Sequence, residues 1–214
     1  MNCILELTWL GHSSFLIKDS KNRLILTDPF NNQVGYDTYK GNADFVTISH
    51  SHFDHSYIDE IKGNPSIIKE SGTYNFDNLN IIGFNSYHDK QQGAVRGKNT
   101  IFTFEVDSYR LCHLGDIGYI LNDDEITALG PIDILLIPVG GNFTIDGKEA
   151  EKLCHKINSS IIIPMHYKTS ILTLPLDGVE NFIRAMKSGE RINSSTIHFH
   201  KKLQGLNEVK ILTI

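Results

Sequence analysis

The pattern of apolar and polar positions changes character about halfway along this chain of 214 residues. In the first half, short apolar segments with alternating or β-branched residues predict strands, separated by turns rich in Gly, Asn and Asp. In the second half, buried strands alternate with segments of helical spacing. This order predicts an α/β (α+β) fold in which sheet and helix layers pack on each other.

The predicted strands cover residues 4–9, 15–18, 23–27, 45–48, 67–68, 79–84, 99–106, 109–114, 133–139, 161–163, 196–199 and 208–212. The predicted helices cover residues 57–62, 123–129, 146–157 and 177–187. Several of the strands end on His or Asp, so packing the sheets together would gather these side chains at one sheet edge.

One segment carries the clearest chemistry. Directly after the apolar strand 45–48 come His50, His52, Asp54 and His55. In an extended or tightly turning backbone, His50 and His52 can converge on one ion, while a turn delivers Asp54 and His55 to a neighbouring position. Imidazole mixed with carboxylate favours a catalytic zinc-type site. The alternative is a polar His-rich loop, but structural zinc sites favour Cys, which this segment lacks.

Composition narrows the function classes. The net charge is −5 and no basic run occurs, which argues against nucleic acid as the main partner. The chain has the length of one domain, residues 1–214, without the start of a signal peptide or an apolar stretch that could span a membrane. Cys3, Cys112 and Cys154 are odd in number and widely separated, which indicates reduced thiols in the cytoplasm. Whether the chain forms a homo-oligomer stays open.

His-x-His-x-Asp-His after an apolar strand resembles the signature of the metallo-β-lactamase superfamily. The segments Leu-Gly-His-Ser at 10–13, Thr-Asp-Pro at 27–29, Arg-Gly-Lys-Asn-Thr at 96–100, Pro-Val-Gly-Gly at 138–141 and Pro-Met-His-Tyr at 164–167 extend this resemblance. They are similar to a branch of small metal-dependent hydrolases related to ascorbate-6-phosphate lactonase and, more distantly, to the N-acyl-phosphatidylethanolamine phospholipase D type. The resemblance implies a four-layer αβ/βα sandwich, the metallo-β-lactamase fold, and gives the reaction only by class.

The resemblance also implies a ligand set for two divalent ions. It places one ion on His50, His52, His88 and Asp116, and the other on Asp54, His55, Asp116 and His166. Asp116 would bridge both ions, and it is assigned to catalysis together with Asp54. His113 is the rival of His88 for the third histidine position. Zinc is the default metal, and manganese, iron and nickel suit the same ligand types.

Other polar residues have a functional and a structural interpretation. Asp28 either caps a turn or, as the resemblance implies, orients a ligand imidazole. His12 either caps its turn or faces the site and binds substrate or a metal-bound oxygen. We expect His113 to support the site or pack in its strand.

Two glycines and two cations complete the set of candidates. Gly140 and Gly141 either form a strand-exit turn or let backbone amides approach an anionic group. Arg96 and Lys168 are candidate anion contacts, although single cations are usually solvated surface residues.

Two ions a few Å apart lower the pKa of a shared water toward ~7, which makes hydroxide available near neutral pH. The favoured function is therefore hydrolysis of an ester, lactone or phosphodiester bond in a small anionic substrate. Two alternatives share the fold: a diiron redox enzyme, which would place Glu at the position of His52, and a ribonuclease, which would need a basic face. A metal-binding protein without activity would have lost a ligand, and here every expected ligand is present.

Overall fold

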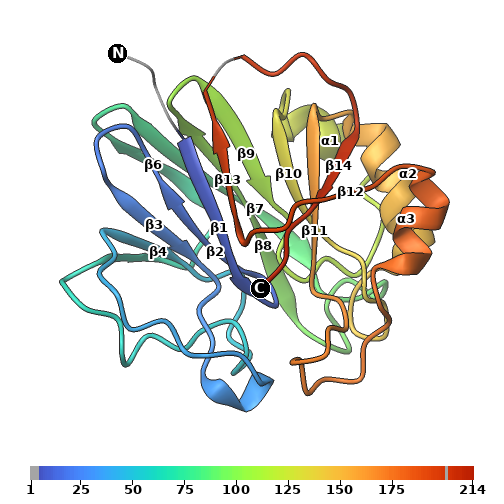
Figure 1. Cartoon of the computed structure of the whole chain (residues 1–214), viewed down its shortest axis with the longest axis horizontal. Coiled ribbons are helices and arrows are strands. Elements are labelled where there is room, and N and C mark those ends of the chain that lie inside the picture. The colour runs from blue at the N-terminus through green and yellow to red at the C-terminus, as the bar shows by residue number, and fades with distance from the viewer. Residues whose placement is uncertain (1–4, 201) are drawn as a thin grey trace.

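In the part of the chain that the structure describes, two β-sheets face each other, and three α-helices cover the outer face of the larger sheet (Figure 1). The structure is a computed structural model that describes residues 5–200 and 202–214, so Cys3 and the predicted strand residue Ile4 lie outside it. The helices are α1 (Asp123–Leu129), α2 (Gly147–Ile157) and α3 (Glu180–Met186). This arrangement confirms the predicted layered α+β sandwich; of the two helical layers in the expected αβ/βα order, the described α-helices form the one on the larger sheet.

The smaller sheet has six strands in the order β13-β1-β2-β3-β4-β5. Its strands are β1 (Leu5–Gly11), β2 (Ser14–Lys18), β3 (Leu24–Thr27), β4 (Phe45–Thr47), β5 (Ser66–Ile68) and β13 (Thr196–Phe199). The hairpin strands β1, β2 and β3 pair antiparallel, while β3, β4 and β5 pair parallel. Consequently β1, β3 and β4 all run in the same direction.

The larger sheet has eight strands in the order β12-β14-β11-β10-β9-β8-β7-β6. Its strands are β6 (Gly72–Phe76), β7 (Leu79–Tyr87), β8 (Lys98–Val106), β9 (Tyr109–His113), β10 (Ile134–Pro138), β11 (Ile161–Met165), β12 (Glu190–Arg191) and β14 (Glu208–Ile211). Strands β7, β8 and β9 pair antiparallel, and β9, β10 and β11 pair parallel. Strands β7, β9 and β11 therefore share one direction.

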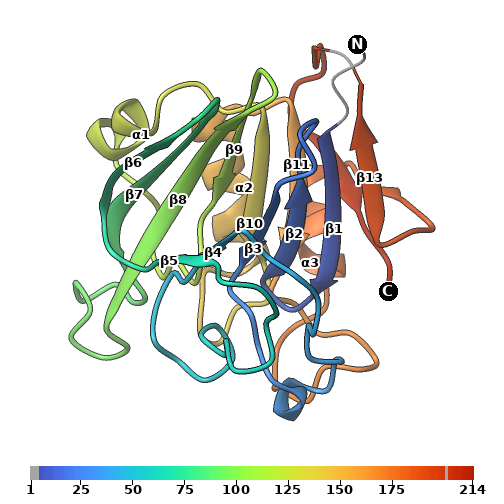
Figure 2. The same cartoon turned by 90° about the vertical axis from the view of Figure 1, so that its left-hand side faces the viewer.

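These directions position the candidate residues. His12, Asp28 and the His-rich motif follow β1, β3 and β4, at one edge of the smaller sheet. His88, Asp116 and His166 follow β7, β9 and β11, at one edge of the larger sheet. The connecting loops gather at the lower end of the molecule in Figure 2. Packing the two sheets face to face thus brings residues that are distant in sequence to one place.

The core lies between the sheets and beneath the helices. Alternate residues of β1 are buried, as expected for a strand with one face in the core. Every residue of β10 and β11 is buried, because one face meets the other sheet and the other meets helices. In α2, the predicted apolar face of Ala150, Leu153, Cys154 and Ile157 is buried. Within the described residues, no helix is long and apolar enough to cross a membrane.

The predicted helix over residues 57–62 is wrong. The segment crosses the smaller sheet as a loop, in which Tyr57 donates its backbone N–H to Pro29 and Lys62 donates to Gly41. Ile61 packs over the sheet beside Leu26 and Val46. Six residues are too few for a helix to be stable without support, so these long-range backbone bonds prevail. The short strands β6 and β12 and a 3₁₀ turn at Asn32–Val34 were not predicted.

Candidate metal centre

Three histidines from two sheets form the first group. His50 and His52 follow β4, and His88 follows β7 on the facing sheet. Each offers a ring nitrogen, and these nitrogens lie within 4.8 Å of one another. His50 and His88 are buried, whereas His52 is exposed. The His-x-His spacing therefore brings both rings of the motif to one point, and the sheet packing supplies the third.

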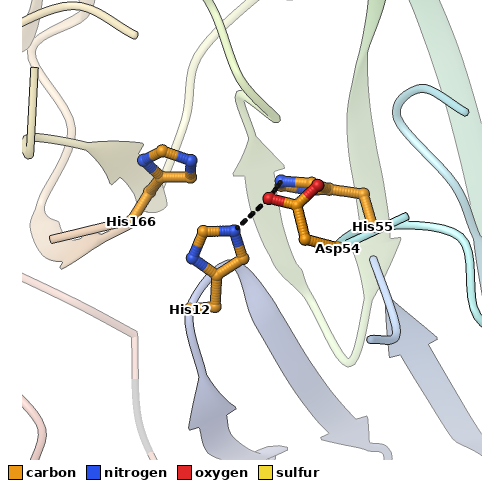
Figure 3. Close-up of side chains that lie close together, drawn as sticks. All are labelled: His12, Asp54, His55 and His166. Carbon is orange, nitrogen blue, oxygen red and sulfur yellow. Dashed lines mark hydrogen bonds and ion pairs between the residues drawn. The ribbon is translucent and has the colours of Figure 1, made fainter. Parts of the chain in front are cut away.

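The second group contains Asp54, His55, His166 and also His12 (Figure 3), whose potential ligand atoms all lie within 4.8 Å of one another. All four residues are buried. His12 Nε2 lies 3.1 Å from Asp54 Oδ2, the contact drawn as a dashed line in Figure 3. His12 thus lies inside the cluster, and it is not among the residues that line the cavity described below.

Asp116 connects the two groups. Its Oδ2 lies 3.1 Å from His166 Nε2, 3.2 Å from His88 Nε2 and 3.3 Å from His55 Nε2. His50 Nε2 is 4.0 Å away. The Asp116 carboxylate therefore lies between the imidazoles of both groups. Its negative charge can interact with positive charge in either group.

The buried charges shift one another's protonation. Burial alone would raise the pKa of Asp116, but the imidazoles of His166 and His55 hold it well below its ordinary value. Burial would lower the pKa of His55, but Asp116, Asp28 and Asp54 raise it well above the ordinary value. Burial and the neighbouring His55 lower the pKa of His50 to about 3. At neutral pH the metal-free centre thus holds an Asp116 carboxylate, a His55 imidazolium and a neutral His50.

Asp28 holds two residues of the His-rich segment, Ser49 and His55, through its carboxylate. Its carboxylate accepts hydrogen bonds from the backbone N–H and the hydroxyl of Ser49, and it lies 2.9 Å from His55 Nδ1. The ring of His55 is thereby fixed with Nε2 toward Asp116. Burial would raise the pKa of Asp28, but His113 and His55 lower it below its ordinary value. This position fits the expected role of orienting a ligand imidazole.

Two supporting residues escaped the sequence-based search. The hydroxyl of Ser49 lies 2.9 Å from His50 Nδ1, and Asn99 Oδ1 accepts the backbone N–H of Asp116 at 2.9 Å. Asn99 is buried in β8 and also donates to the carbonyl of Leu114. A buried Asn within a strand, in the segment 96–100 that carries the family resemblance, was the available signal for Asn99.

His113 is engaged elsewhere. Its Nε2 lies 2.8 Å from the carbonyl oxygen of Ser13, and its Nδ1 accepts the backbone N–H of Gly115 at 3.1 Å. Both ring nitrogens therefore serve the backbone, in the tautomer protonated on Nε2. His113 belongs to neither group, which favours His88 as the third histidine.

A cavity of about 270 Å³ opens above the centre. It is lined by His52, Phe53, Asp54, His88, Arg96, Asp116, Phe143, His166 and Leu174. Arg96 is thus the one of the two candidate cations that reaches it. Lys168 donates instead to the backbone carbonyls of Leu172 and Leu174, so it shapes the loop that carries Leu174.

The two glycines serve packing. A Cβ at Gly140 would overlap the carbonyl oxygen of His166, so the glycine lets the exit of β10 approach this residue closely. Gly141 donates its N–H to Ile145 within the same turn, at a φ of 59°. Neither residue lines the cavity, so the structure favours the turn interpretation over an anion contact.

Comparison with known proteins agrees with this geometry. Residues 6–166 match the family model described as the β-lactamase superfamily domain. The chain belongs to the metallo-β-lactamase superfamily. A UPF0173 metal-dependent hydrolase of Pyrococcus furiosus is 31% identical over 197 residues, which cover 78% of this chain and 86% of that protein. A second, from Carboxydothermus hydrogenoformans, is 29% identical over 196 residues, 77% of this chain and 85% of that one.

A solved structure supports the same assignment. A protein of Thermotoga maritima, described as a candidate Zn-dependent hydrolase of the metallo-β-lactamase superfamily, superposes with a TM-score of 0.83. It is 35% identical and covers 97% of this chain and 98% of that one. Together with the His and Asp groups, these relatives identify the chain as a metal-dependent hydrolase of the metallo-β-lactamase superfamily.

Proposed function

We propose that the centre holds two divalent ions, with zinc as the default metal, and that the protein hydrolyses an ester, lactone or phosphodiester bond in a small anionic substrate. The observation that carries this proposal is the position of Asp116, whose Oδ2 lies 3.1–3.3 Å from Nε2 of His166, His88 and His55. One carboxylate between two groups of ligands suits two neighbouring dications, because its negative charge offsets their repulsion.

The residues present fit such ions. Among the described residues, His50 Nε2 and Asp116 Oδ1 are buried and have no hydrogen-bond partner. Buried polar atoms are normally satisfied, so these two are suited to coordinate a cation. His50, His52, His88 and Asp116 would hold one ion, and Asp54, His55, Asp116 and His166 would hold the other. Imidazole and carboxylate donors suit zinc and leave open positions for substrate.

Ions bound there would supply hydroxide from water near neutral pH and polarise a carbonyl or phosphoryl oxygen. The chain's own residues hold the geometry. Asp28 fixes the ring of His55, Ser49 fixes that of His50, and His12 fixes the Asp54 carboxylate. Asp54 belongs to the second group and Asp116 connects the two groups, and both carboxylates line the cavity.

The partner is a small molecule. A cavity of about 270 Å³ is near the lower end of the size of small-molecule sites, about 300 Å³. The net charge of −5 disfavours nucleic acid. We place the protein in the cytoplasm because its three cysteines are too few and too scattered for a disulfide framework.

Metal analysis combined with a substrate panel tests the proposal. Elemental analysis should find close to two ions per chain, and the zinc-loaded protein should cleave at least one of a set of aryl esters, lactones and aryl phosphodiesters. Chelation should abolish the activity. A single tightly held ion with full activity would contradict the dinuclear centre. Bound iron with oxygen consumption and no hydrolysis would instead indicate the redox alternative.

Asp116→Asn provides the matched variant. The amide keeps the shape but loses the charge, so one ion should bind much more weakly and the rate should fall sharply, while the fold persists. Asp89→Asn is the control, because the contacts of the Asp89 carboxylate within the described part of the chain are with backbone N–H groups of residues 91–96. Two undiminished binding events in Asp116→Asn, measured by calorimetry, would show that Asp116 does not bridge.

A further inference from the structure

Arg96 is a cation in the wall of the cavity that the proposed mechanism does not use. Its guanidinium lies 4.7 Å from the centroid of the Phe143 ring and donates to the carbonyl oxygen of Asn142 at 3.3 Å. Among the described residues, no carboxylate lies within 4.0 Å of it, whereas most other ionic groups around the centre are paired. Because a guanidinium has five N–H donors, most of its hydrogen-bonding capacity stays available.

The protein fixes this cation from two sides. The backbone N–H of Arg96 donates to Asp89, whose carboxylate also accepts from Gln91, Gly93 and Val95. The loop between His88 and Arg96 is therefore held on one carboxylate, directly after a proposed metal ligand. The cation–π contact with the Phe143 ring holds the guanidinium from the second side. A pre-organised Arg loses less freedom on binding a ligand than a mobile surface Arg does.

The other residues that line the cavity favour a bound molecule with both an apolar and an anionic part. Phe53, Phe143 and Leu174 line the cavity beside Arg96, and the Phe53 side chain is 52% exposed. The carboxylates in the cavity, Asp54 and Asp116, are each engaged by histidines. A molecule that enters the cavity therefore meets the imidazoles of the proposed metal ligands, an apolar surface and the guanidinium of Arg96.

We infer that Arg96 binds an oxyanion, a carboxylate or a phosphate, that the substrate carries away from the bond that is cleaved. The apolar chain between this anion and the reacting group lies against Phe143 and Leu174. This inference rests on the proposed hydrolysis and narrows its substrate class to bifunctional molecules with a scissile acyl or phosphoryl group at one end and an anion at the other. Guanidinium recognises both oxyanions through paired N–H donors.

Three matched aryl esters test this assignment with the zinc-loaded protein. They are p-nitrophenyl pentanoate, the half-ester mono-p-nitrophenyl glutarate and p-nitrophenyl phosphonobutanoate, which differ in ending on a methyl, a carboxylate or a phosphonate. Arg96→Met should lower kcat/KM for the two anionic esters by about 10- to 100-fold, chiefly through KM. The pentanoate should change less than about twofold, since it offers nothing to the guanidinium. Whichever of the two anionic esters, carboxylate or phosphonate, shows the larger loss of kcat/KM carries the preferred oxyanion.

The control variants are Arg96→Lys, which should restore part of the loss, and Arg184→Met, an exposed change on α3 that should have no effect. Calorimetric binding of the corresponding anilides, pentananilide and glutaric acid mono-anilide, gives the same comparison without turnover. One outcome is that no ester is cleaved but Arg96→Met still weakens binding of glutaric acid mono-anilide and not that of pentananilide. This would contradict the proposed hydrolysis and leave Arg96 as the anion site. Equal losses on all three esters, or no loss on any, with no anilide discrimination, would overturn the role of Arg96.

Discussion

At the scale of single residues, the centre holds three non-glycine residues in the left-handed region. The φ angles are 52° at His12, 40° at Asp28 and 52° at His166. Such conformations cost about 1–3 kcal/mol each and persist only where the surroundings fix them. The carbonyl of His12 accepts from the Trp9 indole and from the backbone of His166, at 3.0 and 3.1 Å. The positions of His12 and His166 are therefore coupled through the backbone.

We predict that His12→Asn weakens one of the two ions selectively. Asn tolerates the left-handed backbone but removes the imidazole that contacts Asp54. The affinity of the ion at Asp54, His55 and His166 should fall by about 10- to 100-fold, while that of the other ion is preserved. Metal titration by calorimetry measures both. His155→Asn, on the surface of α2, is the control, and equal weakening of both ions would contradict the prediction.

A second residue-scale prediction separates His88 from His113. His88→Ala should lose metal and activity, because its Nε2 lies 3.2 Å from Asp116 Oδ2. His113→Ala should retain metal but lose stability, because the backbone groups of Ser13 and Gly115 lose their buried partner. Metal content and thermal unfolding of both variants decide the matter. The reverse ranking in metal content would mean that the third histidine is misassigned.

At the scale of elements, the loop after β7 depends on one carboxylate. Asp89 accepts four backbone N–H groups between Gln91 and Arg96, and these hydrogen bonds lower the pKa of Asp89 although burial opposes them. The loop has little apolar support, since Val95 is 62% exposed. Local order here thus comes from polar bonds to Asp89.

Asp89→Ala should therefore loosen this loop while leaving the metal centre intact. We expect faster hydrogen exchange of the amides in 91–96 and unchanged metal affinity, with weaker binding of the anionic esters that reach Arg96. Lys90→Ala, a change in the same loop that removes a surface ion pair with Glu149 of α2, serves as the control. Unchanged exchange in Asp89→Ala would show that other contacts order the loop.

Element-scale prediction from sequence succeeded where the periodicity was long or the caps were clear. The helix α2 begins after Asp146 in a capping box with Glu149, and its predicted apolar face is the buried one. The segment 57–62 failed because its pattern is short and its backbone donors find partners in distant loops. The helix α3 is shorter than the predicted 177–187, and Asp177, which precedes it, donates its N–H to the carbonyl of Gly140.

At the scale of the whole molecule, the buried histidines make stability depend on pH. Burial lowers the pKa of His12 to about 4, and that of His50 to about 3, from an ordinary value of 6.5. Below pH 6.5 the unfolded chain takes up protons at both residues, and the folded protein does not until pH falls to about 4. His55, with its raised pKa, is protonated in the folded protein, so it opposes this trend near pH 6.5 and adds no dependence once the unfolded residue is also protonated at lower pH.

The free energy of unfolding of the metal-free protein should therefore fall as pH decreases from 6.5 to 4. The slope is at most about 1.4 kcal/mol per pH unit for each of the two histidines. Urea unfolding in the presence of a chelator measures it at several pH values. His12→Asn should make the slope shallower without abolishing it, because His50 and His52 also have lowered pKa values. A pH-independent free energy would contradict the assignment of neutral His12 and His50.

The sequence by itself determined the family, the layered fold and the residues that could ligate a metal, because these depend on local pattern. His50, His52, Asp54 and His55 are neighbours in the chain, and strand ends are visible in the apolar periodicity. Only the tertiary structure decided which distant residues meet them. In the tertiary structure His88 lies at the centre, whereas His113 bonds to the backbone. His12 is buried against Asp54, and Arg96 lines the cavity while Lys168 does not. The physical reason is that these positions follow from how two sheets pack face to face, and no single segment encodes that packing.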